Sequence, residues 1–99
     1  MNLDEFHSFV KRLEQPPTEL SLPLVALWWD AKGDWTKAHD SAQQDESRDG
    51  SWVHAYLHRK EGDSSNAGYW YGRAGKPHFG GSLDEEWAAI AAALLQESS

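Results

Sequence analysis

The sequence contains no cysteine and few basic residues, and both absences exclude classes of protein. Without cysteine the chain forms no disulfide, thiol nucleophile, iron–sulfur cluster or cysteine-ligated zinc site. Nine Lys and Arg stand against sixteen Asp and Glu, which gives a formal net charge of -7. Because a protein that follows nucleic-acid phosphates needs a basic face, we expect no nucleic-acid partner.

Long hydrophobic runs and a basic N-terminal segment are also missing. The longest apolar runs, residues 22–29 and 88–95, are far shorter than the roughly 20 residues that a membrane-spanning helix needs. The start of the chain lacks the positive region of a secretory signal peptide. We therefore expect a cytoplasmic protein with no membrane partner.

Aromatic residues, in contrast, are plentiful. Six tryptophans, three tyrosines and three phenylalanines make up 12% of the chain, a share that is atypical of disordered proteins. A chain of 99 residues has room for one domain, so we expect a single domain over residues 1–99.

Capping and stop signals divide the chain into helices. Two capping boxes, at residues 2–5 and 82–85, predict the starts of an N-terminal and a C-terminal helix. No window alternates apolar and polar residues for long enough to demand a strand. Six helices are predicted, over about residues 3–14, 24–32, 34–46, 51–60, 63–74 and 83–96. The predicted fold class is all-α.

The central four helices form two repeat-like units, over about residues 22–46 and 51–77. The dipeptides Gly33-Asp34 and Gly62-Asp63 stand 29 positions apart, and each predicts a turn between two helices. One helical hairpin cannot bury its apolar face alone, so we expect the two units to stack between the terminal helices.

The second unit resembles the second half of a tetratricopeptide repeat. Gly62, Ala67, Tyr71 and Ala74 fit four positions of that motif, whereas the first unit departs from it at Ala42, which replaces a large aromatic residue. The segment 52–63 also resembles a small bacterial protein family, which implies no function. The repeat resemblance implies that proteins or peptides bind in a groove lined by the first helix of each hairpin.

The resemblance to the repeat implies which residues line this groove. They are Leu27, Asp30 and Ala31 in the first unit and Trp52, Tyr56, Arg59 and Lys60 in the second. Trp28 and Trp70 are further binding candidates, because adjacent helical residues point about 100° apart and these aromatics cannot all face inward. Either they lie in the groove or the terminal helices cover them. The predicted function is a protein- or peptide-binding adaptor without catalysis or cofactor, and a homodimer closed by exposed tryptophans is another interpretation.

Three histidines support an alternative function. His54 and His58, four residues apart on one predicted helix, project from one face as many metal ligands do, although the Glu of the metalloprotease motif is missing. His39-Asp40 on the preceding helix could complete a small-molecule or metal site with hydrolytic chemistry. The same pattern is also explained by histidines that are packed in the interior without binding a ligand. Such buried rings would need polar partners such as Asn66.

Overall fold

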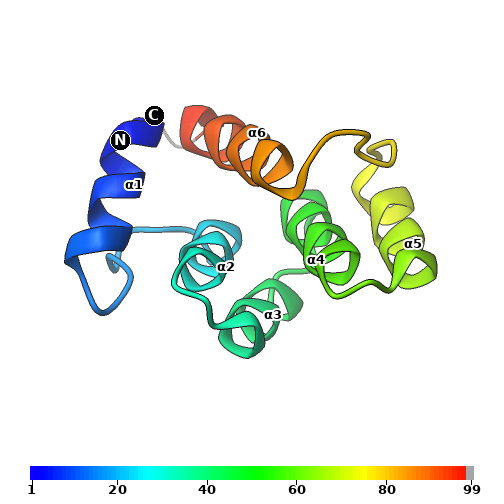
Figure 1. Cartoon of the computed structure of the whole chain (residues 1–99), viewed down its shortest axis with the longest axis horizontal. Coiled ribbons are helices and arrows are strands. Elements are labelled where there is room, and N and C mark those ends of the chain that lie inside the picture. Colours follow the sequence, from blue (N-terminus) through cyan, green and yellow to red (C-terminus); the bar gives the residue numbers. More distant parts are fainter. Residues whose placement is uncertain (98–99) are drawn as a thin grey trace.

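Six α-helices make up the part of the chain that the computed structural model describes, residues 1–97 (Figure 1). They are α1 (Leu3–Arg12), α2 (Leu22–Ala31), α3 (Trp35–Gln43), α4 (Arg48–Lys60), α5 (Ser64–Ala74) and α6 (Leu83–Glu97). No strand occurs in this range, so the predicted all-α class with six helices is confirmed. No helix in this range is long and apolar enough to cross a bilayer.

Local signals set most of the helix ends. The side chain of Asn2 accepts a hydrogen bond from the backbone N–H of Glu5 at 2.8 Å, and Glu5 accepts one from Asn2 at 3.0 Å, which completes the first capping box. Gly33 and Gly62 adopt positive φ angles of 85° and 91°, a conformation that L side chains rarely adopt. These two glycines let α2 reverse into α3 and α4 into α5, which produces two helical hairpins.

The start of α4 differs from the prediction. We expected Asp49-Gly50 to be a loop before a helix from residue 51, but α4 begins at Arg48, and the side chain of Ser47 caps it. Gly50 is a buried helical residue, and a Cβ there would lie 2.1 Å from the carbonyl oxygen of Asp45. A glycine is therefore required at position 50 because the backbone of Asp45 lies close to it, and not because the chain turns there. The preceding helix also ends three residues early, at Gln43.

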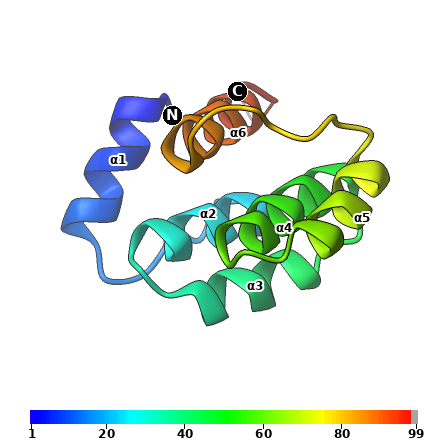
Figure 2. The same ribbon diagram turned by 45° about the vertical axis from the view of Figure 1, so that its right-hand side comes forward.

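The two hairpins form one layer of helices, and α6 packs across it. The two hairpins lie side by side, α3 against α4, while α6 crosses over α2 and α4 and α1 packs against α6 (Figures 1 and 2). The main core lies between α6 and this layer, and its largest fully buried apolar side chains are Phe6, Leu24, Leu27, Trp28, Val53, Leu57 and Ile90. Trp87 of α6 donates its indole N–H to the carbonyl oxygen of Leu27 at 3.0 Å.

A buried carboxylate also attaches α6 to the hairpins. Glu86 is fully buried; its two oxygens accept hydrogen bonds from Arg59 at 2.9 Å and from the hydroxyl of Tyr71 at 2.5 Å. Arg59 also donates to the carbonyl oxygen of Gly81, just before α6. Because a buried charge is tolerated only when it is paired and hydrogen-bonded, this network specifies how α6 docks on α4 and α5.

Candidate metal centre

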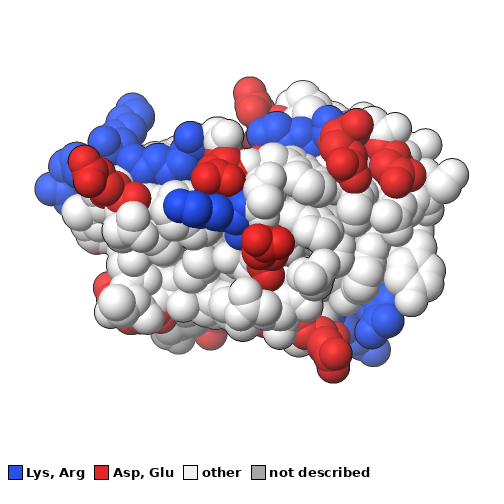
Figure 3. Space-filling view, turned by 90° about the horizontal axis from the view of Figure 1, so that it is seen from below, with Lys and Arg blue, Asp and Glu red and all other residues white. Residues whose placement is uncertain are grey.

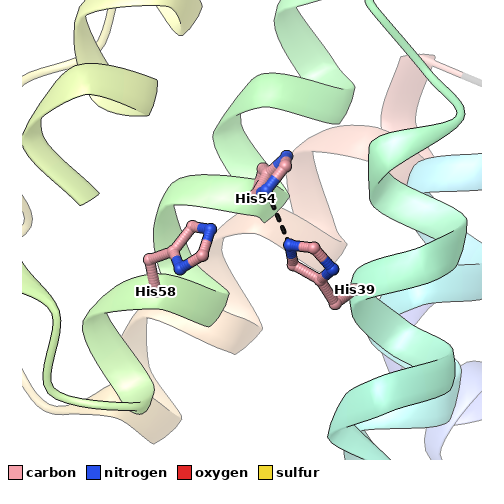
Figure 4. A group of neighbouring side chains, drawn as sticks. All are labelled: His39, His54 and His58. Atoms are coloured by element: carbon pink, nitrogen blue, oxygen red, sulfur yellow. Dashed lines mark hydrogen bonds between the residues drawn. The ribbon is translucent and has the colours of Figure 1, made fainter. Parts of the chain in front are cut away.

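Three histidine side chains converge between α3 and α4. His39 comes from α3, and His54 and His58 come from successive turns of α4 (Figure 4). One ring nitrogen of each lies within 4.8 Å of the others, and the Nε2 atoms of His39 and His54 are 2.9 Å apart. His54 and His58 are only 4% and 7% exposed, whereas His39 is partly exposed and closes the cluster on its solvent side.

Two tryptophans fix the orientation of two of these rings. Trp35 stacks on His39 with ring centroids 4.9 Å apart, and Trp70 of α5 stacks on His54 at 3.9 Å. Trp35 is itself held by a hydrogen bond from its indole N–H to the carbonyl oxygen of Leu57, 3.0 Å long. Because stacked rings in a packed site have few alternative rotamers, the histidines are preorganised.

The third ring is oriented by polar neighbours. The Nδ1 atom of His58 lies 2.5 Å from a carboxylate oxygen of Glu61, and its Nε2 atom lies 3.4 Å from the side-chain amide nitrogen of Asn66. An ionised Glu61 can only accept a hydrogen bond, so His58 carries a proton on Nδ1. In the neutral ring Nε2 is then the unprotonated nitrogen, which accepts the long hydrogen bond from Asn66 and would exchange it for a metal ion. A carboxylate behind the non-coordinating nitrogen is the usual support of a metal-binding histidine.

The surroundings keep two of the rings neutral. Burial, together with the neighbouring histidines His39 and His58, lowers the pKa of His54 to about 4. Burial and the charge of His58 likewise lower the pKa of His39 below its ordinary value of 6.5. Both rings are therefore neutral at neutral pH, which is the charge state in which imidazole binds a metal.

The spacing of the nitrogens fits a tetrahedral ion. Zinc–nitrogen bonds of about 2.0–2.1 Å place two ligand nitrogens about 3.3 Å apart in tetrahedral geometry. The ligand atoms of the cluster all lie within 4.8 Å of one another, with His39 and His54 at 2.9 Å, so their separations are of the size that a shared ion requires. His58, Glu61 and Asp63 form a second such group, but its two carboxylates are exposed, as acidic side chains without an ion commonly are.

Two residues predicted to bind a partner are buried instead. Tyr56 is 2% exposed, and its hydroxyl donates to a carboxylate oxygen of Asp30 at 2.6 Å. Trp28 is completely buried in the main core, and its indole nitrogen has no hydrogen-bond partner within the described part of the chain. α6 covers part of the face on which the groove was predicted, but Asp30, Ala31, Tyr56 and Lys60 of that groove line one cleft.

The other predicted binding residues contact different parts of the molecule, although Lys60 lines the same cleft as Tyr56. Arg59 pairs with Glu86, and the ammonium of Lys60 lies 2.8 Å from a carboxylate oxygen of Asp30. Trp70 stacks on the histidine cluster. Trp52 is half-buried beneath the ammonium of a lysine that follows α5.

Sequence reasoning missed two members of the site. Trp35 stands four residues before His39, and Glu61 three residues after His58, so each lies near its histidine on or just beyond the same helix. That helical spacing was the signal that could have identified them. Comparisons with protein-family models, with curated proteins and with solved structures find no match for this chain.

Proposed function

We propose that this protein binds one divalent transition-metal ion, most readily zinc, through His39, His54 and His58. The observation that carries the proposal is the convergence of three histidines, two of them buried and two with pKa values below their ordinary range, with ligand atoms within 4.8 Å. Imidazole ligands suit Zn²⁺, Cu²⁺ and Ni²⁺, and tetrahedral nitrogen coordination favours Zn²⁺ among these.

A three-histidine site leaves a fourth coordination position. In this protein that position would open beside His39, the partly exposed member of the cluster. Sites with three protein ligands and one open position lower the pKa of a bound water to about 7. The chemistry that this arrangement would support is therefore hydrolysis by an activated water.

Isothermal titration calorimetry of the metal-free protein with Zn²⁺ tests the proposal. We expect one ion per chain, with His39→Ala and His58→Ala each weakening the binding by more than about 100-fold. His78→Ala, which removes an exposed histidine outside the cluster, is the matched control and should bind as the original protein does. Circular dichroism shows which variants fold. Affinity that is equal in folded His39→Ala and in the control would refute the site.

Protein or peptide binding, the first function inferred from the sequence, stays a prediction, as do a homodimer and a cytoplasmic location. α6 packs on both α2 and α4, and an open cleft remains beside α1. The exposed aromatic side chain best suited to contact a partner is Tyr69, which is 57% exposed on α5.

A further inference from the structure

A cleft of about 620 Å³ is lined by residues of α1, α2, α4 and α6. It lies on the opposite face of α4 from the histidine cluster, because Tyr56 and Lys60 in its lining each follow a cluster histidine by two helical positions. Volumes of about 300–1,000 Å³ are typical of small-molecule sites. The cleft therefore has the size of a ligand site that is separate from the metal centre.

The floor of the cleft is a fixed polar group. Asp30 is 5% exposed, and its two oxygens accept hydrogen bonds from Tyr56 at 2.6 Å and from Lys60 at 2.8 Å. Burial, the bond to Asp30 and nearby acidic charges raise the pKa of Tyr56, so its hydroxyl keeps its proton. The side chain of Lys60 is 40% exposed and lines the cleft, so its ammonium can also face a ligand.

The walls add charges of both signs and an apolar surface. Lys11 reaches the cleft from α1 and Asp84 from the first turn of α6, and both are exposed. Figure 3 shows basic and acidic side chains together at the end of the molecule where α1 lies. Val10, Ala31 and Ala88 supply apolar wall between these charges.

We propose that this cleft binds a free amino acid with a large apolar side chain. Lys11 and Lys60 receive its carboxylate, and Asp84 receives its ammonium. The apolar wall takes the side chain. A ligand of one charge sign fits less well, because an anion meets Asp84 and a cation meets the two lysines.

Three probes with the same aromatic body separate these charge requirements. They are L-phenylalanine, 3-phenylpropanoate and 2-phenylethylamine, each titrated while the indole N–H signal of Trp87, which lines the cleft, is followed by NMR. We expect L-phenylalanine to shift this signal saturably and the two singly charged analogues to bind at least about fivefold more weakly. Failure of L-phenylalanine to saturate by about 10 mM, or equal binding of 3-phenylpropanoate, overturns the proposal.

Variants at exposed positions test the charges without disturbing the core. Lys11→Ala and Asp84→Asn are each expected to weaken L-phenylalanine binding by about three- to tenfold. Lys37→Ala removes an exposed lysine of α3 outside the cleft and is the matched control, with no expected change. Unchanged binding in both Lys11→Ala and Asp84→Asn overturns the assignment of the ligand class. The metal-free protein serves throughout, so the result is independent of zinc binding.

Discussion

The Nε2 atoms of His39 and His54 lie 2.9 Å apart, although the two residues belong to different helices. At this distance two imidazole nitrogens share one proton, because two N–H groups facing each other would repel. The contact therefore requires at least one unprotonated nitrogen. A metal ion that replaced the shared proton would bind both nitrogens, with His58 as the third ligand.

The pKa of His54 makes the fold sensitive to acid. Its value in the folded protein is about 4, below the ordinary 6.5, so between these values the unfolded chain takes up a proton that the folded chain does not. Folded-state stability from the neutral ring is therefore present above pH 6.5 and falls as the pH drops toward 4. We expect the unfolding free energy to decrease by about 2 kcal/mol over this range, measured by urea denaturation with a chelator present.

A substitution identifies the group responsible for that loss. His54→Gln keeps a polar side chain but does not titrate, so its unfolding free energy should depend less on pH between 4 and 6.5. The exposed His7→Gln should retain the original dependence. An identical pH slope in His54→Gln and the original protein would show that His54 is not the acid-sensitive group.

Glu61 is predicted to strengthen metal binding without contacting the ion. Its carboxylate lies 2.5 Å from Nδ1 of His58 and directs the other ring nitrogen toward the cluster. Glu61→Gln, a weaker acceptor, should reduce Zn²⁺ affinity by about tenfold in calorimetry. Glu46→Gln removes an equal charge from an exposed position between α3 and α4 and controls for net charge. If both variants lose the same affinity, the effect is general electrostatics and not orientation of His58.

Glu86 is predicted to hold α6 on the hairpins. Glu86→Ala leaves the hydroxyl of buried Tyr71 and the guanidinium of Arg59 without their shared acceptor. We expect the unfolding free energy to fall by about 3 kcal/mol or more in urea denaturation. Asp84→Ala, an exposed acid in the same helical turn, should change it by less than about 1 kcal/mol. Similar losses in the two variants would contradict the role of the buried network.

Two helical glycines should respond in opposite directions to alanine. A Cβ at Gly50 would lie 2.1 Å from the carbonyl oxygen of Asp45, whereas one at Gly72 would meet nothing within 4 Å. Gly50→Ala should destabilise the protein by about 2 kcal/mol or more, and Gly72→Ala should stabilise it by about 0.5–1 kcal/mol. Thermal unfolding of the two variants measures the contrast, and a stable Gly50→Ala protein would show that the Asp45 backbone can move aside.

Sequence patterns predicted the elements better than their packing. The helices follow from signals within a few residues, such as the Asn2 capping box and the turns at Gly33 and Gly62. The predicted start of α4 was wrong because Gly50 is a glycine for its close contact with the backbone of Asp45 and not for a turn. That contact spans a loop, and hydrophobic periodicity does not reveal it.

The same limit applies to the site. His54 and His58 share a face by helical spacing alone, and His39 was named as their companion on the preceding helix. The burial of Trp28 and Tyr56 depends instead on where α6 crosses the two hairpins. Capping and turn signals, which act over a few residues, do not specify that position. Helical spacing therefore identified the histidine cluster but did not specify which groove residues are buried, and partner binding in the groove stays a prediction.

The nitrogen signals of the imidazole rings test the metal centre most directly. In a long-range ¹H–¹⁵N spectrum, one equivalent of Zn²⁺ should shift one ring nitrogen each of His39, His54 and His58, with Nε2 the nitrogen that shifts in His58. The signals of His7 and His78 should stay in place, since neither residue belongs to the cluster. Unchanged signals from the three cluster histidines, or shifts at His7 and His78 instead, would contradict the proposed site.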